Sequence, residues 1–201
     1  MIKIKNLKKF YNNRLILDIS ELDLDAGKVY SLIGRNGAGK STLLNILSGV
    51  LSSDEGYIET DLDETILCPQ EPMFFKGDVV YNLTEPFKLM GKNIEISKVR
   101  EQLKNFGISE LENSLISTLS GGEKAKVQFV RTKLYDKKIV LLDEPTASID
   151  KKSTALVEEA IVKMKNEGKL ILIITHNYEQ ALRISDTIFE IDDGKLIRRR
   201  I

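Results

Sequence analysis

The sequence has few of the features that mark secreted, disulfide-bonded or membrane-spanning proteins. Its single cysteine, Cys68, excludes an intrachain disulfide, and a small buried residue is its simplest role. The longest apolar run, at 170–174, has the length of a strand and is far too short to cross a bilayer. The first five residues alternate apolar and polar side chains like a strand, without a signal-peptide apolar core. We therefore expect a cytoplasmic protein, which another subunit would have to hold at any membrane where it works.

Net charge is also absent. Lysine and arginine together number 30, as do aspartate and glutamate, so the formal net charge is zero. A protein dedicated to nucleic acid usually carries a basic excess, so we expect no nucleic-acid partner. The 201 residues are 42% hydrophobic and 30% charged, which is ordinary for a chain that buries a core. This length suits one domain, with or without an inserted subdomain.

The most specific local motif is a glycine-rich segment. It fits the pattern G-x-x-x-x-G-K-[S/T] and reads Gly34-Arg35-Asn36-Gly37-Ala38-Gly39-Lys40-Ser41-Thr42. The glycines allow a tight turn that brings backbone N–H groups close to a polyphosphate. Lys40 can reach the β- and γ-phosphates, and the Ser41 hydroxyl can join a Mg²⁺ shell. An apolar strand precedes the segment and a helix follows it, so the positive end of the helix dipole is expected to point at the anion.

Chemically reactive side chains follow two other apolar segments. The strand expected at 139–142 ends in Asp143 and Glu144, and the strand expected at 170–175 ends at His176, the only histidine. Wholly apolar strands are typical of a parallel sheet covered on both faces, and such sheets bind ligands at their carboxyl edge. Asp143 can hold the water shell of a metal, and Glu144 can accept a proton from an attacking water. A solvated acidic turn and a structural histidine are the alternatives.

The middle of the chain, from about 78 to 135, is expected to be helical. Asp78 and Ser97 are placed to cap two of its helices, and Gly107 is placed to end the second. The segment Leu119-Ser120-Gly121-Gly122-Glu123 comes directly before a further helix. Two glycines at that position leave the first N–H groups of the helix open to an anion. A plain helix cap explains the segment equally well when it is considered alone.

Strand ends and turns supply the remaining candidates. Tyr11 precedes a turn at Asn12-Asn13, where its ring could stack on a purine or simply be half exposed. Gln70 follows a short strand at 65–68 and is a potential polar ligand. Short strands are expected at 2–5, 15–19 and 22–24, and two closing edge strands at 187–191 and 196–199. The basic tail, Arg198-Arg199-Arg200, is either a solvated terminus or a contact to lipid or a partner.

Taken together, these motifs resemble the nucleotide-binding subunit of ATP-binding cassette (ABC) transporters over nearly the whole chain. Gly34 to Thr42 matches the phosphate loop, Gln70 the Q-loop glutamine, and His176 the switch histidine. Residues 119–123 match the family signature L-S-G-G-[E/Q] without a change, and 139–144 match the Walker B strand with its catalytic glutamate. The signature is the most specific of these elements, because other phosphate-loop families lack it.

The resemblance implies an α/β fold: the phosphate-loop NTPase (RecA-like) core with a mostly parallel sheet, a small antiparallel β-subdomain and an inserted α-helical subdomain. Residues 1–201 would form a single ABC ATPase domain, with the core at about 1–70 and 136–201 and the helical subdomain at about 71–135. The stretch between Gly56 and Gln70 is shorter than is usual in the family, so we expect a trimmed β-subdomain.

The resemblance also implies ATP and Mg²⁺ as ligands and assigns roles. Lys40, Glu144 and His176 would be catalytic, and Ser41, Gln70 and Asp143 would hold Mg²⁺. The implied nucleotide-binding residues are Tyr11, Gly34, Arg35, Asn36, Gly37, Ala38, Gly39, Lys40, Ser41, Thr42, Gln70, Ser120, Gly121, Gly122 and Asp143.

The implied partners are a second copy of the chain, or a paralogous ATPase subunit, and a transmembrane permease subunit. In a head-to-tail dimer, the Ser120-Gly121-Gly122 turn of one copy would close on the nucleotide of the other, and 148–150 resembles the D-loop that crosses the interface. The protein would then be peripheral on the inner face of the cell membrane. Residues 73–75 are either a contact for the permease or part of the core of the helical subdomain.

The cargo is not encoded in such a subunit, but 70–77 looks like ATPases of oxyanion importers, the tungstate type especially. A short exporter ATPase is the alternative within transporters. A soluble ABC ATPase acting on nucleic acid or ribosomes usually carries two cassettes or a long coiled-coil insertion, which this sequence lacks. A phosphate-loop kinase would have no use for 119–123.

Overall fold

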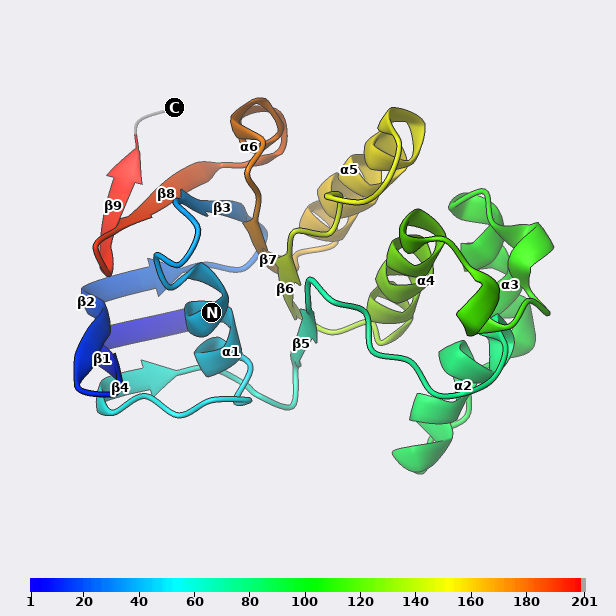
Figure 1. The fold of residues 1–201 in the computed structure, drawn as a ribbon, viewed down its shortest axis with the longest axis horizontal. Coiled ribbons are helices and arrows are strands. Elements are labelled where there is room, and N and C mark those ends of the chain that lie inside the picture. Colours follow the sequence, from blue (N-terminus) through cyan, green and yellow to red (C-terminus); the bar gives the residue numbers. More distant parts are fainter. Residues whose placement is uncertain (200–201) are drawn as a thin grey trace. The chain divides into compact units, whose positions relative to one another are not determined.

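A computed structural model describes residues 1–199, which form two units (Figure 1). The first unit comprises 1–67, 137–144 and the chain from 161 to the end of the described residues. The second comprises 68–136 and 145–160. The domain boundaries implied by the family resemblance stay a prediction. Arg200, the last arginine of the basic tail, lies outside the described residues.

Two β-sheets form the framework of the first unit. The smaller sheet is antiparallel and has the order β2-β1-β4, and the larger has the order β5-β6-β7-β3-β8-β9. In the larger sheet β6, β7, β3 and β8 are parallel, and β9 is antiparallel to β8. The mostly parallel core and the small antiparallel sheet of the predicted fold are thus confirmed. The strands are β1 (Ile2–Tyr11), β2 (Arg14–Leu24), β3 (Val29–Gly34), β4 (Glu55–Glu59), β5 (Thr65–Cys68), β6 (Ile139–Asp143), β7 (Leu170–Ile174), β8 (Thr187–Asp192) and β9 (Lys195–Arg199).

The β1–β2 hairpin turns at the two asparagines that the sequence marked as a turn. Asn12 and Asn13 both have positive φ, 47° and 62°, which is the conformation that a two-residue hairpin loop requires. The expectation of separate strands at 15–19 and 22–24 was wrong. Pairing with β1 runs from one end of β2 to the other, and it continues across 20–21, where the alternation of buried side chains shifts by one residue.

The expectation that 187–191 is an edge strand was also wrong. β8 pairs with β3 on one side and with β9 on the other, so only β9 closes this end of the sheet. β9 is mostly exposed and rich in charged side chains, as befits an edge, whereas β8 is mostly buried.

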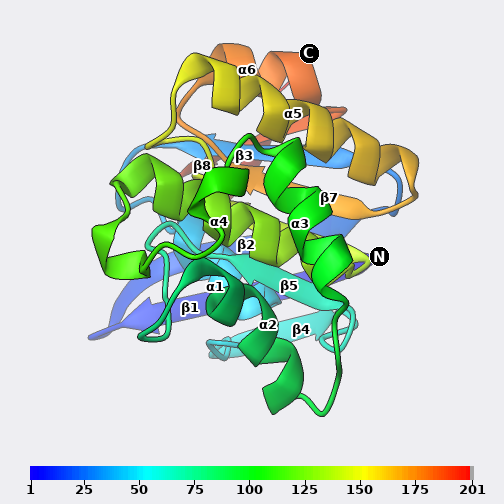
Figure 2. The ribbon, with the colours of Figure 1, turned by 90° about the vertical axis from the view of Figure 1, so that its right-hand side faces the viewer.

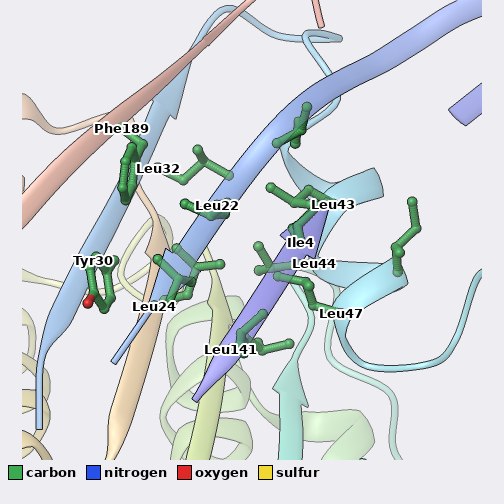
Figure 3. Close-up of a cluster of buried hydrophobic side chains, with 14 of the residues drawn as sticks. Ile4, Leu22, Leu24, Tyr30, Leu32, Leu43, Leu44, Leu47, Leu141 and Phe189 are labelled. Atoms are coloured by element: carbon green, nitrogen blue, oxygen red, sulfur yellow. The ribbon is translucent and has the colours of Figure 1, made fainter. Parts of the chain in front are cut away.

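Helix α1 (Lys40–Leu47) is fixed by the core of the first unit. Its residues Leu43, Leu44 and Leu47 are fully buried and point into the cluster shown in Figure 3, which also receives Ile4 from β1 and Leu141 from β6. Removing one such buried leucine side chain typically costs about 2–5 kcal/mol. The packing therefore anchors the residues that follow the glycine-rich segment.

The second unit is mainly helical (Figure 2). The helices of the described chain, besides α1, are α2 (Val79–Leu89), α3 (Ile96–Asn105), α4 (Gly121–Leu134), α5 (Lys151–Asn166) and α6 (Tyr178–Ile184), with short 3₁₀ turns at Ser109–Leu111 and Ile116–Thr118. Asp78 caps α2 as predicted, accepting a hydrogen bond of 2.7 Å from the backbone of Tyr81. Ser97 does not cap α3, because the helix begins two residues earlier, with Glu95 at the N-cap. The hydroxyl of Ser97 donates instead to the Glu95 carboxylate, at 3.2 Å.

We predict that Gly34→Ala destabilises the protein more than Gly37→Ala does. Both glycines have positive φ, 142° and 78°, which costs an alanine about 1–2 kcal/mol. At Gly34 the added Cβ would also lie 2.5 Å from the carbonyl oxygen of Ile191 on β8, whereas at Gly37 it would meet nothing within 4 Å. Relief of the clash would disturb β3–β8 pairing and cost about 1–3 kcal/mol more. Urea unfolding without nucleotide measures both variants, and equal midpoints would contradict the β3–β8 contact.

Candidate functional site

The glycine-rich segment connects β3 to α1 and leaves the first turn of the helix open. Gly39 is the N-cap, with φ 102°, and it offers no side chain to the first N–H groups of α1. The first turn also contains no acidic residue. The tip of the loop, Arg35-Asn36-Gly37, is exposed. A helix N-terminus of this kind suits an anion, because its N–H groups and its dipole are both available.

Lys40 lies beneath this loop and is bound to it. Its side-chain ammonium donates hydrogen bonds of 2.8 Å and 2.9 Å to the carbonyl oxygens of Gly34 and Arg35, and the residue is only 7% exposed. Burial lowers the pKa of Lys40, while the charges of Glu144 and Asp143 act in the opposite direction. The loop therefore holds one cation at a fixed position, close to two carboxylates.

Asp143 ends β6 and is buried among groups that can compensate its charge. Burial raises the pKa of Asp143, whereas a hydrogen bond from the Ser41 hydroxyl and the charges of Lys40 and His176 lower it. The Ser41–Asp143 pair is an oxygen-rich pair of side chains at the carboxyl edge of the parallel sheet. The described residues contain no group of three or more histidine, cysteine, aspartate or glutamate side chains that could hold a metal on their own. Mg²⁺ fits such a site, because it usually takes one or two protein ligands and completes its shell with phosphate and water.

Glu144 is held in an unusual conformation directly after the strand. Its φ is 51°, which is uncommon for a residue other than glycine, and its backbone N–H donates to the carbonyl of Ile174 at 3.1 Å. Its side chain is 8% exposed, with Oε1 lying 2.9 Å from Nε2 of His176. That distance permits an ion pair when the imidazole is protonated, and the backbone N–H of His176 also donates to the carboxylate. Burial raises the pKa of Glu144, with His176 opposing the shift and Asp143 adding to it.

A strained backbone and a buried carboxylate are both costly, and they commonly mark functional residues. Glu144 carries both features. The structure therefore brings Lys40, Ser41, Asp143, Glu144 and His176 together in the first unit, as the sequence predicted for the carboxyl edge of a parallel sheet.

His176 is positioned by neighbours that the sequence did not single out. The Thr175 hydroxyl accepts a hydrogen bond of 3.1 Å from the backbone of Asn177 and donates one of 2.7 Å to Gln180. Asn177 in turn caps α6, accepting from the backbone of Gln180 at 3.0 Å. The short polar residues on both sides of the histidine are the signal that could have indicated this turn.

Tyr11 is half exposed at the β1–β2 turn, with the Lys9 ammonium 5.7 Å from the centre of its ring. The stacking role expected of Tyr11 stays a prediction.

In the second unit, the segment 119–123 forms a complete capping box. Ser120 is the N-cap of α4, and its hydroxyl accepts a bond of 3.3 Å from the backbone of Glu123. The Glu123 carboxylate accepts from the backbone and the hydroxyl of Ser120, at 2.8 Å and 2.7 Å. A Cβ on Gly122 would lie 2.7 Å from the Ser148 carbonyl, so that position has no space for a larger residue. The plain helix cap is therefore present in the free chain.

The D-loop-like segment carries a second strong cap. Asp150 accepts hydrogen bonds from the backbone and hydroxyl of Ser153, at 3.0 Å and 2.6 Å. These bonds lower the pKa of Asp150 to about 2. The carboxylate is therefore charged at any ordinary pH and fixes the start of α5.

The segment that contains Gln70 has no regular structure, but α4 holds its backbone. The amide of Gln128 donates to the carbonyl of Pro69 at 3.4 Å, and Arg131 donates to that of Met73 at 2.7 Å. The Arg131 guanidinium also lies 4.9 Å from the centre of the Phe74 ring and bonds to Gln128 at 2.6 Å. The contacts of Arg131 and Gln128 depend on tertiary structure, and their spacing of one helical turn was the only signal for them in the sequence.

The other end of this segment is held by α2. Asn82 is fully buried, and its side chain bonds to the backbone N–H and carbonyl of Phe75, at 2.8 Å and 3.1 Å. Phe75 itself is exposed, and Met73 is 76% exposed. The interpretation of 73–75 as subdomain core is therefore wrong for these two side chains. The hydrogen bonds from Arg131 and Asn82 hold the backbone of the segment, and the side chains of Met73 and Phe75 remain exposed to solvent.

Comparisons with known proteins identify the family of this chain. The family model described as ABC transporter matches residues 17–147. The tungstate uptake system ATP-binding protein TupC of Peptoclostridium acidaminophilum is 39% identical, over 97% of this chain and 96% of its own length. The lantibiotic transport ATP-binding protein SrtF of Streptococcus pyogenes is 32% identical, over 98% and 89%. A dimeric ATP-binding cassette solved in a post-hydrolysis state with ADP and phosphate has the same fold, with a TM-score of 0.90 at 23% identity and full coverage of both chains.

The fold and the matched motifs define an ATP-binding cassette. The chain belongs to the ABC transporter family, and it is an ATP-binding subunit and an ATPase, as the resemblance implied. No helix within residues 1–199 combines the length and the apolar character needed to cross a membrane.

We predict that Glu144→Gln raises the melting temperature of the nucleotide-free protein at pH 7.5. The folded state raises the pKa of Glu144 above its ordinary value of 4.5, so above that pH it binds more protons than the unfolded state does. The free energy of unfolding of the wild type therefore falls as pH rises through this window, and an uncharged amide escapes the loss. A gain of about 1 kcal/mol would appear as about 2–4 °C at this chain length.

The difference should shrink as pH falls toward 4.5 and vanish below it, where the carboxyl is protonated in both states. Glu59→Gln is the matched control, because this exposed carboxylate lies on the same unit and should give no change. Scanning calorimetry at several pH values measures all three proteins. A melting temperature lowered by Glu144→Gln at pH 7.5 would contradict the electrostatic account.

Proposed function

We propose that this chain hydrolyses ATP in a head-to-tail dimer with a second copy of itself or with a paralogous subunit. The observation that carries the proposal is Glu144, a buried carboxylate on a strained backbone, placed beside Lys40 and His176. A solved cassette of the same fold is dimeric with ADP and phosphate bound, which supports the dimer. The Ser120-Gly121-Gly122 turn of one copy would complete the phosphate site of the other, adding backbone N–H groups and a helix dipole.

The residues of the first unit divide the chemistry among them. Lys40 neutralises charge on the β- and γ-phosphates, and the loop backbone holds them. Ser41 and Asp143 would hold Mg²⁺, which when bound neutralises further phosphate charge. Glu144 orients the attacking water and accepts its proton, a role for which a raised pKa is suited. His176 fixes Glu144 and steadies the γ-phosphate. The metal role expected of Gln70 and the adenine stacking expected of Tyr11 rest on the family resemblance.

We further propose that the chain works with a transmembrane permease, on the cytoplasmic face of the cell membrane. The exposed side chains of Met73 and Phe75 follow Gln70 directly, and their backbone is clamped by Arg131 and Asn82. Large exposed apolar side chains on a firmly held backbone suit a protein contact. A movement of Gln70 would then be passed to the permease, because hydrogen bonds hold the backbone that connects Gln70 to Met73 and Phe75.

The cargo that we propose is an oxyanion of the tungstate type. Its support is the 39% identity with TupC over almost the full length of both proteins, compared with 32% for the lantibiotic transport protein. Other relatives at 32% are named for ribose import and methionine import, so identity in this range does not follow cargo. The alternatives remain a short exporter ATPase and a soluble ABC ATPase that acts on nucleic acid or ribosomes.

We predict that Glu144→Gln binds ATP, hydrolyses it at least about a hundredfold more slowly, and accumulates as a dimer. The amide cannot accept the proton of the attacking water, so the dimer closed on ATP persists. Size-exclusion chromatography with saturating ATP and Mg²⁺ measures the dimer, and phosphate release measures the rate.

The double variant Glu144→Gln, Ser120→Arg is the control, because a bulky cation at the start of α4 should block closure and leave a monomer that still binds ATP. If the double variant still dimerises with ATP, the proposed head-to-tail arrangement is contradicted. A Glu144→Gln protein that stays monomeric with ATP would remove the self-closing dimer.

We predict that a strain lacking this subunit accumulates several-fold less tungsten from medium containing trace tungstate. Complementation with the wild-type chain should restore uptake, and complementation with Lys40→Ala should not. Elemental analysis of washed cells provides the measurement. Unchanged tungsten content together with altered sensitivity to an exported peptide would favour the exporter alternative, and co-purification of the chain with nucleic acid would favour the soluble one.

A further inference from the structure

We propose that Glu123 is a positioning residue that holds the hydroxyl of Ser120 away from phosphate until an ATP-loaded partner displaces it. Glu123 would thereby set how tightly the two copies close on ATP. The inference rests on the proposed head-to-tail dimer, because Ser120 acts on the nucleotide of the other copy.

The geometry that carries the inference is the use of a single carboxylate oxygen for two donors. Oε2 of Glu123 accepts the backbone N–H of Ser120 at 2.8 Å and the Ser120 hydroxyl at 2.7 Å. The same hydroxyl accepts the N–H of Glu123 at 3.3 Å. Hydrogen bonds to a charged acceptor are among the stronger ones in proteins. The hydroxyl that the family signature supplies is therefore already engaged in the free chain.

A serine hydroxyl has only one hydrogen, so it cannot donate to Glu123 and to a phosphate at once. An approaching γ-phosphate also meets the negative charge of Glu123, directly beside the hydroxyl that it would use. Closure of the dimer must therefore exchange one anionic acceptor for another, and the carboxylate must turn aside. Its bonds to Ser120 keep this carboxylate ionised by lowering the pKa of Glu123.

The structure also provides a place for the displaced carboxylate. Lys126 lies three residues further along α4, on the same side of the helix, and its charge already acts on Glu123. The carboxylate can turn toward Lys126, and phosphate can then replace it as the acceptor at the N-terminus of α4. The exchange is therefore local and does not require α4 to unfold.

A capping box that serves only the stability of α4 makes the opposite prediction. In that case, weakening the Glu123 bonds would loosen the helix N-terminus and weaken the dimer. If Glu123 competes with phosphate, weakening them frees the hydroxyl and tightens the dimer. Glu123→Gln separates the two accounts, because its amide oxygen can still accept the Ser120 N–H but carries no charge.

The experiment measures the dimer dissociation constant by sedimentation at saturating ATP and Mg²⁺, with Glu144→Gln present in every protein to prevent turnover. We expect Glu123→Gln to lower this constant about tenfold, the change expected when a charge-assisted hydrogen bond is replaced by a neutral one. Glu101→Gln on α3, which removes an exposed charge from the same unit, should leave it unchanged. Binding of a fluorescent ATP analogue to the monomer should be the same in all of them, because Ser120 acts in trans.

The Ser120→Ala background tests whether the hydroxyl is the route. In that background Glu123→Gln should change the dimer dissociation constant much less. An undiminished change would mean that Glu123 acts only by charge repulsion, which would overturn the positioning role. A dimer that forms with Glu144→Gln but is unchanged or weakened by Glu123→Gln would overturn the inference and leave the proposed function standing. If no variant dimerises with ATP, the proposed dimer fails and the inference fails with it.

Discussion

The parallel pairing of β6, β7 and β3 is the constraint on which the candidate site depends. Ile174 of β7 is in register with Leu32 of β3 on one side and with Asp143 of β6 on the other. β6 and β7 therefore end at the same level of the sheet, and β3 runs only two residues further, to Gly34. The residues that follow them, the glycine-rich loop, Glu144 and the turn at His176, are brought to one edge although they lie far apart in the sequence. The apolar side chains that pack these strands have no chemistry of their own, but a shift of one residue in any pairing would separate the groups that carry it.

Collecting charges at this edge is unfavourable for the folded chain. Burial acts against the charged form of Lys40, Asp143 and Glu144 alike, and the mutual attraction of cation and carboxylates recovers only part of the cost. The left-handed conformation of Glu144 adds backbone strain. The rest of the first unit can offset the cost of these buried charges and of the strain, because α1 and both sheets share one apolar core. A site that is poorly compensated in the free chain is one that a polyphosphate, with its own charge and oxygen ligands, can stabilise.

Much of this arrangement could be predicted from the sequence, because its strongest signals are local. Wholly apolar strands, glycine at the turn positions and acidic residues directly after a strand each follow from short segments, and the parallel sheet then brings them together. The predictions were wrong where strand pairing, or competition between nearby residues for the N-cap of a helix, determines the structure. Nothing within 187–191 shows that this strand pairs with a neighbour on each side. The N-cap of α3 is Glu95 and not Ser97. The φ of Glu144 and the contacts of Arg131 and Gln128 with the Gln70 segment depend on distant residues, and the sequence offers for them no more than a spacing of one helical turn.

Lys40 and Ser120 are both expected to meet the γ-phosphate and are both hydrogen-bonded within the chain, but the consequences differ. The ammonium of Lys40 has three hydrogens and uses two of them on the neutral carbonyls of Gly34 and Arg35, so one remains for a phosphate. The hydroxyl of Ser120 has one hydrogen, which the charged Glu123 already accepts. Nucleotide binding to the loop therefore needs no exchange of partners at Lys40, whereas closure by the second copy needs one at Ser120. Under the proposed function this difference orders the two events, with binding first and closure second, and it places the exchange of partners on the signature segment.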